Sequence, residues 1–183
     1  MNGTLNVSSI GTLPLANNRL TLSAGSTLTN NGIISTTIPT STNASWVVDS
    51  RNGSGTGTTP GVFGGTISYD APSGAQTIVA GTYTNLTLSN SSGTNTAGGA
   101  ITASGTLTIP TGSTLDMSTF QLNATTIVTS SGSIVRTSST SNPAIISNTI
   151  AFNGVFIFEA NGSSIQYIGK TGTSISYDEL RFD

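Results

Sequence analysis

The sequence predicts an all-β protein built as a parallel β-helix, or β-solenoid, of short strands. Three observations indicate this fold class: short runs alternate apolar and polar residues, Gly or Pro interrupts nearly every longer window, and one order of motifs occurs twice. Alternation places apolar side chains on one face of a strand, whereas a helix would need apolar residues three and four apart. An antiparallel β-sandwich also has alternating strands and regular turns, and it is the alternative fold.

Short alternating runs mark the expected strands along the chain. They lie at residues 20–22, 67–69, 86–88, 107–109, 165–167 and 180–182. Between them stand Gly-Ser, Asn-Gly, Ser-Gly and Pro-containing clusters, which end strands because they supply positive or preset φ angles. We therefore expect the chain to turn about every 8 to 12 residues.

Two segments of similar sequence define the expected domain organisation. Residues 20–28 (LTLSAGSTL) match residues 107–115 (LTIPTGSTL), and the motifs at 46–49, 67–69 and 85–88 have counterparts at 156–159, 165–167 and 179–182. Such recurrence is typical of stacked repeat architectures. We divide the chain into the end of a preceding unit at 1–19, repeat unit one at 20–106, and repeat unit two at 107–183, which is truncated at its C-terminal end. Unit one carries an extra Gly-rich stretch near 53–60, expected to be a surface loop.

The composition fits stacked strands and argues against several partners. Only 7% of the residues are charged, against about a quarter in ordinary domains, and stacking favours neutral ladders of Thr, Ser and Asn because like charges would repel. The five basic residues are scattered, so nucleic acid is not expected as a partner. No apolar run approaches the roughly 20 residues that span a bilayer, so no membrane span is expected.

Neither His nor Cys occurs in the chain. The usual general base, the thiol nucleophile and the commonest metal ligands are thus missing, and we expect no catalytic residue, no metal site and no cofactor. A polysaccharide-degrading β-helix would need converging carboxylates, and it is the least favoured function. The acidic residues considered for it are Asp49, Asp70, Asp116, Glu159, Asp178 and Glu179. The Thr content also raises ice binding, but a regular Thr-x-Thr array on one flat face is not apparent in the sequence.

Trp46 and Tyr83 are the candidate ligand-binding residues. An aromatic ring can stack on the C–H face of a sugar, which makes a carbohydrate-binding module the alternative function and cell-surface or environmental glycans the expected partners. Both residues lie within alternating runs, where packing in the core is the simpler interpretation.

Residues 65–88 (GTISYDAPSGAQTIVAGTYTNLTL) resemble the repeats of very large surface adhesins and filament-like proteins of Bacteroidetes. The resemblance extends from about Leu20 to Asp183, and it implies export, commonly by the type nine secretion system, and a role in surface attachment or gliding. We therefore expect an extracellular, cell-surface protein that is not an enzyme. The expected function is a non-catalytic structural or adhesive stalk or fibre segment that can self-associate end to end.

Overall fold

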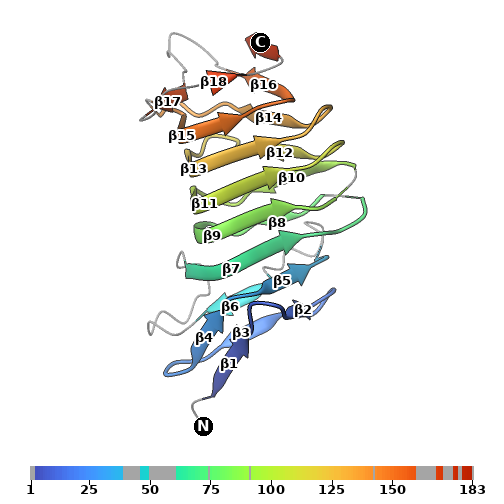
Figure 1. Ribbon diagram of the computed structural model, residues 1–183, viewed down its shortest axis with the longest axis vertical. Coiled ribbons are helices and arrows are strands. Elements are labelled where there is room, and N and C mark those ends of the chain that lie inside the picture. Colours follow the sequence, from blue (N-terminus) through green and yellow to red (C-terminus); the bar gives the residue numbers. More distant parts are fainter. Residues whose placement is uncertain are drawn as a thin grey trace.

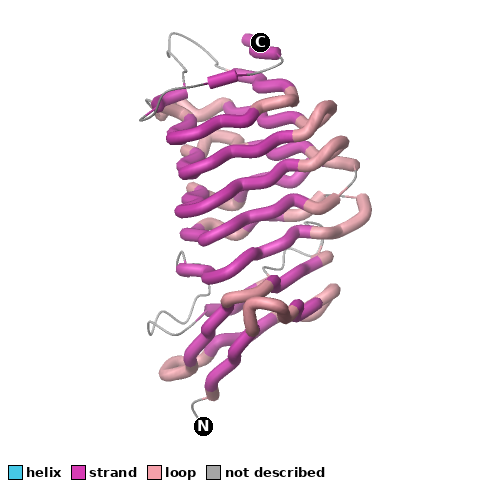
Figure 2. Tube along the Cα trace, viewed as in Figure 1, coloured by secondary structure: helices cyan, strands magenta, loops and turns pink. Residues whose placement is uncertain are grey.

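A computed structural model confirms the parallel β-solenoid. It describes residues 3–38, 46–49, 61–73, 75–90, 92–141, 143–159, 168–170, 175–176 and 179–182. These residues contain strands and no helix (Figure 2). Each strand pairing among them is parallel, and no two strands that follow one another in the chain pair with each other. The antiparallel sandwich is therefore wrong, because its hairpins would pair consecutive strands antiparallel.

Two larger sheets run along the molecule (Figure 1). The nine-stranded sheet contains β2 (Thr12–Pro14), β5 (Ile33–Thr36), β7 (Gly61–Tyr69), β9 (Gly81–Leu88), β11 (Ile101–Ile109), β13 (Leu122–Thr129), β15 (Ile145–Ala151), β17 (Ile168–Lys170) and β18 (Ile175–Ser176). The six-stranded sheet contains β8 (Thr77–Ile78), β10 (Thr94–Ala97), β12 (Thr114–Asp116), β14 (Ile134–Thr137), β16 (Val155–Phe158) and β19 (Glu179–Phe182).

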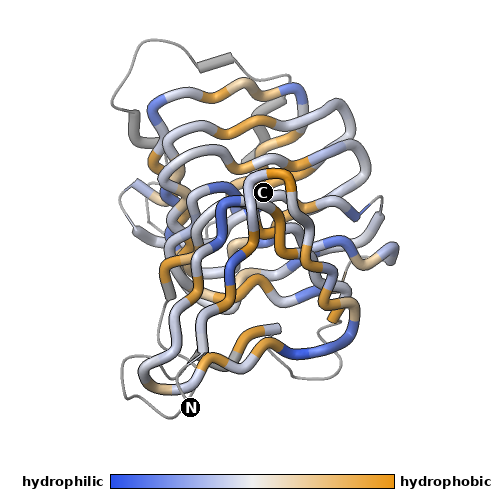
Figure 3. The backbone as a smooth tube through the Cα atoms, turned by 60° about the horizontal axis from the view of Figure 1, so that its bottom comes forward, coloured by the Kyte–Doolittle hydropathy of each residue, from blue (hydrophilic) through white to orange (hydrophobic). Residues whose placement is uncertain are grey.

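Two small sheets complete the N-terminal end. They pair β1 (Thr4–Val7) with β4 (Thr27–Asn30), and β3 (Leu20–Leu22) with β6 (Val47–Asp49). From β7 to β16 the chain alternates between the nine-stranded and the six-stranded sheet. One full turn of the chain around the core is called a coil here, and β1, β2 and β3 form the first coil. The stacked coils enclose one hydrophobic core. Figure 3 shows the backbone of the coils with the N-terminal end turned forward.

The coil length sets the strand register. Gly81 pairs with Ile101, Ile101 with Leu122, and Leu122 with Ile145, so each partner lies one circuit further along the chain. The repeat that the structure shows is therefore one coil of roughly 20 residues, at the short end of the range for stacked structural repeats. Since a coil contains two strand regions and two turns, the chain turns about as often as the sequence predicts.

An aliphatic column forms the centre of the core. Leu or Ile occupies the same register position in successive strands of the nine-stranded sheet: Leu13, Ile34, Ile67, Leu86, Leu107, Ile127 and Ile150. All but Leu13 are buried. Full burial of such a side chain stabilises the fold by about 1.5 to 3 kcal/mol, so each coil gains stability chiefly from the coils above and below it.

Large side chains move from one sheet to the other along the core. In the nine-stranded sheet one inward column runs from Phe63 and Tyr83 to Ala103, Ala124 and Ser147. In the six-stranded sheet the inward column holds Asn95, Leu115 and Val135 and then, one coil further, the larger Phe156. Because protein interiors are close-packed, the loss of volume on one side is matched by a gain on the other.

Near β8 and β10 a buried network of hydrogen-bonded amide side chains replaces apolar packing. The Gln76 side chain donates to the Thr36 and Ile38 carbonyls and accepts from the Ala71 N–H. Asn95 accepts from the Gln76 N–H and donates to Asn90. Since buried polar groups cost stability unless paired, these contacts let amides replace aliphatic residues inside the coil.

The expected strands at 20–22, 67–69, 86–88, 107–109 and 180–182 lie in β3, β7, β9, β11 and β19. The expected strand at 165–167 and the Gly-rich stretch near 53–60 lie outside the described residues. The two similar segments occupy different places: residues 20–22 form β3 in a two-stranded sheet, whereas residues 107–109 end β11 in the nine-stranded sheet. Their likeness reflects a shared strand-and-turn chemistry, and the division into two long units remains a prediction.

Candidate functional site

Trp46 and Tyr83 lie inside the solenoid, not on its surface. Trp46 is 1% exposed and Tyr83 0% exposed. Phe63 lies between them, with ring centroids 5.2 Å from Trp46 and 5.1 Å from Tyr83. A sugar ring has no access to these faces, so the geometry favours the packing interpretation over glycan stacking.

The buried hydroxyl of Tyr69 links this aromatic cluster. It accepts hydrogen bonds from Trp46 Nε1 at 2.7 Å and from the Val79 N–H at 2.9 Å. The Tyr83 hydroxyl lies 3.4 Å from it and donates to the Val79 carbonyl. Burial raises the pKa of Tyr69 to about 12, although its hydrogen bonds oppose the shift. Burial, reinforced by the neighbouring Tyr69, raises the pKa of Tyr83 well above its ordinary value.

Two of the acidic residues meet at one arginine on the outside of the six-stranded sheet. Arg136 Nη2 lies 2.6 Å from Asp116 Oδ2, and Arg136 Nη1 lies 3.9 Å from Glu159 Oε1. The other oxygen of Asp116 accepts the Ser118 N–H at 2.8 Å. Asp116 is thus fully engaged by its own chain, which fits a structural ion pair better than an acid or base waiting for substrate.

The remaining carboxylates form no second cluster in the described part of the chain. Asp70 follows β7, and partial burial raises its pKa, against a lowering effect of its hydrogen bond to Ser35. Its Oδ1 has no hydrogen-bond partner. The side chains of Asp49, Asp178 and Glu179 lie outside the described residues.

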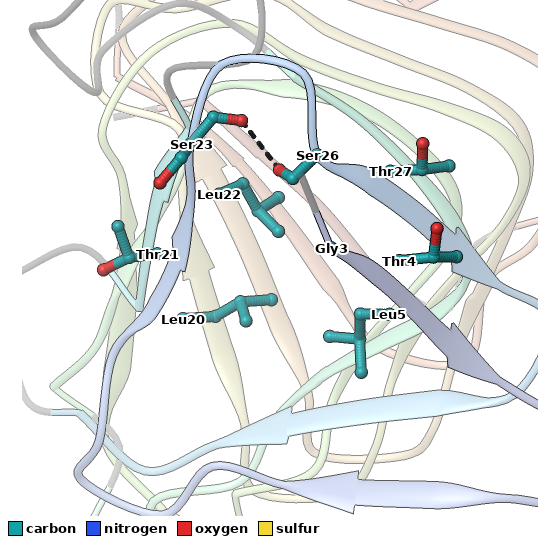
Figure 4. Close-up of a pocket in the computed structure, with 9 residues that line it drawn as sticks. All are labelled: Gly3, Thr4, Leu5, Leu20, Thr21, Leu22, Ser23, Ser26 and Thr27. Atoms are coloured by element: carbon teal, nitrogen blue, oxygen red, sulfur yellow. Dashed lines mark hydrogen bonds between the residues drawn. The ribbon is translucent and has the colours of Figure 1, made fainter. Parts of the chain in front are cut away.

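A cavity of about 290 Å³ lies at the N-terminal end of the described chain. Leu5 of β1 and Leu20 and Leu22 of β3 face this space, while Thr21 points away from it (Figure 4). The turn at its edge is fixed by a 2.7 Å hydrogen bond from Ser26 Oγ to the Ser23 carbonyl. The lining offers three apolar side chains and no charge, so it is suited to apolar contact and has no group for acid–base chemistry.

Among the described residues there is no group of three or more His, Cys, Asp or Glu side chains that could hold a metal ion. The same residues include no helix long and apolar enough to cross a membrane.

The fold and its surfaces define a β-solenoid repeat protein. Comparison with protein-family models, with curated proteins and with solved structures finds no match to this chain. The class therefore rests on the strand register and the stacked core alone.

Sequence reasoning missed the ion pair, although a signal for it exists. Asp116 and Arg136 stand at the same register position of β12 and β14, one coil apart, and Arg136 and Glu159 are separated by a similar stretch of chain. Scattered charges come together when their separation equals one coil. Without knowledge of that period, the same residues look isolated.

Proposed function

We propose that this chain is a non-catalytic structural segment, a stalk or fibre segment of a secreted bacterial surface protein that carries an adhesive region away from the cell. The observation that carries the proposal is the nine-stranded parallel sheet, whose strands follow one another along the longest axis of the molecule (Figure 1). Inter-strand hydrogen bonds therefore run along the axis, and tension between the two ends would load many of them together.

The resemblance of residues 65–88 to surface adhesin repeats supports the extracellular location. The low charge supports the stalk architecture, because neutral residues can stack in successive coils without repulsion between like charges. A carbohydrate-binding function has no comparable support, since both of its candidate rings are buried.

The location is tested on intact cells that produce the full protein. We expect an antibody fragment raised against the folded chain to bind without permeabilisation, and electron microscopy to place the label away from the outer membrane. Mild proteolysis of intact cells should remove the label. Labelling that appears only after permeabilisation would overturn the proposal.

End-to-end association is the second part of this proposal. In the first coil Leu5, Leu13 and Leu20 are only half-buried, whereas Ile34 and Val47, which pair with Leu13 and Leu20, are buried. The described residues include no strand on the free edges of β1, β2 and β3. Because every coil has the same parallel direction, a further coil could add there in register, and unpaired strand edges favour such addition.

Light scattering and small-angle X-ray scattering over a range of concentrations test this association. We expect the mass to rise in whole multiples of the chain while the maximum dimension grows in steps. Leu20→Lys should abolish growth, because it places a charge in the apolar end cavity, and Thr21→Lys, which points away, should leave it intact. A chain that stays monomeric at every concentration would contradict end-to-end stacking.

A further inference from the structure

The outer face of the nine-stranded sheet carries uncharged side chains, most of them short. It is formed by the outward residues of β7, β9, β11, β13 and β15, which lie side by side in Figure 1. Three register columns make up this surface, called the threonine face here. They are Val62, Thr82, Thr102, Asn123 and Ile146; Thr66, Asn85, Thr106, Thr126 and Thr149; and Ser68, Thr87, Thr108, Val128 and Ala151.

The second and third columns of the threonine face lie on one side of the register shift in the sheet, and together they form a two-dimensional grid. Neighbouring strands lie about 4.8 Å apart, and alternate residues on one strand lie about 6.6 Å apart, so two columns of the face repeat in both directions. In β11 the grid contains Thr106 and Thr108, which are in register with Thr126 and Val128 of β13. The sequence hides this array because partners are a coil apart and several positions hold Asn, Ser or Val.

The hydroxyl groups on this face are free to meet an external partner. Within the part of the chain that the structure describes, none of the eight threonine side chains of the face makes a hydrogen bond. At the bend of the sheet the situation differs, since Thr125 Oγ1 donates to the Ser104 carbonyl at 2.8 Å and Ser104 Oγ donates to the Tyr83 carbonyl at 3.2 Å. Hydroxyls elsewhere thus stabilise the coil. The Ser68 hydroxyl, at the edge of the face, also does so, since it is buried and lies 2.9 Å from Ser89 Oγ, whereas the eight threonine hydroxyls are left to solvent.

Thr is also a stiff residue. Its β-branched side chain has a restricted χ1, so the hydroxyl and the methyl group keep fixed positions on a sheet that is itself rigid. A short side chain loses little rotamer entropy when it meets a surface, unlike Lys, Arg or Gln. The threonine face is therefore suited to a partner that is flat, rigid, uncharged and periodic.

We propose that the threonine face binds ice. Water oxygens in ice repeat along one lattice direction at a spacing close to that between β-strands, so the grid can hold several waters in lattice positions at once. A single hydroxyl gains little binding free energy when it exchanges a liquid water for a water of the ice lattice. Many such contacts made at once by one rigid surface add up, as in multivalent binding. The proposal does not depend on the stalk function.

Other partners fit the face less well. Crystalline polysaccharide is bound chiefly by exposed aromatic rings, and Trp46, Phe63 and Tyr83 are buried. Protein interfaces depend on aromatic and Arg anchors, and none of the fifteen positions of the threonine face holds such a residue.

The six-stranded sheet supplies a control surface. Its outward columns include Thr96, but the next positions in that column are Asp116 and Arg136, which form the ion pair. The charged side chains of this ion pair interrupt the grid there. A substitution at Thr96 is therefore matched to one at Thr108, since both residues are half-buried on an outer sheet face.

The experiment grows ice slowly in a solution of the purified chain and measures the protein in ice and in liquid, together with the shape and melting–freezing gap of single crystals. We expect the chain to concentrate in the ice and to produce faceted crystals. Thr108→Tyr should lower the incorporation by about tenfold, because one bulky ring separates the grid from the lattice over many contacts. Thr96→Tyr should leave incorporation unchanged.

Thr149→Tyr, at an exposed position of the same face, provides a second variant should Thr108→Tyr fail to fold, with circular dichroism as the folding control. Exclusion of the chain from ice with rounded crystals would overturn the proposal. So would equal incorporation of folded face variants and the parent chain. Adsorption to crystalline cellulose or chitin without adsorption to ice would likewise overturn it and assign the face to polysaccharide.

Discussion

The buried hydroxyl of Tyr69 connects two coils of the solenoid by hydrogen bonds. It accepts from Trp46 and from the Val79 N–H, two donors that belong to different coils. The Trp46 indole N–H is shut off from water, since Trp46 is 1% exposed, whereas Val79 is half-buried. The aromatic residues that first suggested a binding surface instead tie neighbouring coils together through the core.

Removing this hydroxyl should cost more than removing that of Tyr83. Tyr69→Phe leaves the buried Trp46 indole N–H and the part-buried Val79 N–H unpaired. Since an unpaired buried donor costs about 1 to 3 kcal/mol and a part-buried one costs less, we expect a loss of about 2 to 4 kcal/mol in the free energy of unfolding. Tyr83→Phe deletes the same atom from an equally buried ring, but the main group left without a partner is the Val79 carbonyl. We therefore expect a loss of about 1 to 2 kcal/mol in the free energy of unfolding. Denaturant unfolding measures both. Equal losses would show that the Tyr69 hydroxyl has no special role.

The same tyrosines predict alkaline instability. Burial holds the pKa of Tyr69 near 12 and also raises that of Tyr83, whereas the ordinary value is 10.0. Above pH 10 the unfolded chain therefore releases protons that the folded chain retains, and stability falls as the pH rises from 10 toward 12. Tyrosinate absorbance and circular dichroism followed together should show these two residues ionising as the strands are lost. Complete ionisation in a chain that keeps its β signal would contradict the prediction.

At the scale of the strand, the aliphatic column explains why the coils are so evenly stacked. Each member is covered by the equivalent residue above and below, as Leu107 is by Leu86 and Ile127. Leu13, in the first coil, is covered on one side only and remains half-buried. The same residue type at one register position thus has two environments within a single chain.

A pair of matched substitutions tests this nearest-neighbour stabilisation. Leu107→Ala should reduce the free energy of unfolding by about 2 to 5 kcal/mol, because it leaves a cavity between two complete coils. Leu13→Ala should cost about 1 to 2 kcal/mol, since less apolar area is lost and the end can relax. Thermal and denaturant unfolding provide the comparison. A larger loss at Leu13 would mean that the terminal coil, not the middle, controls stability.

The whole molecule is a one-dimensional array of coils, since each coil contacts mainly the coils directly before and after it along the axis. Such architectures gain stability from interfaces between repeats, and their ends are the least stable parts. The open edge at β1, β2 and β3 and the half-buried leucines beside it mark one such end of the described chain. The length of the stack, more than any single contact, determines the rigidity that the proposed stalk function requires.

Hydrogen exchange should reveal this gradient. We expect the amides of β9, β11 and β13 to exchange most slowly, because these strands are paired on both sides, and those of β1 to β3 to exchange fastest. Mass spectrometry of the exchanged and digested protein resolves the two groups. Uniform protection from β1 to β13 would indicate all-or-none unfolding and would contradict a line of separable neighbours.

The sequence by itself determined that the chain is all-β, where five of its strands lie, and that neutral residues stack in place of charges. These properties are local, because alternation with a period of two and turn residues act within a few positions. Runs such as Leu107 to Ile109 could therefore be recognised without knowing what lies above them.

Only the tertiary structure decided which residues meet across coils and which face of each strand is turned inward. Alternation sorts side chains into two faces but does not say which face the coil encloses, so Trp46 and Tyr83 could be read as surface residues. Likewise Asp116 meets Arg136, and Thr106 meets Thr126, because winding brings positions one coil apart into register. Gly105 shows how closely successive coils approach one another. A Cβ atom there would lie 2.7 Å from the Thr84 carbonyl oxygen of the preceding coil, so the position favours glycine. The number of residues in a coil is set by how the chain closes around the core, and this number cannot be found from any short stretch of the sequence.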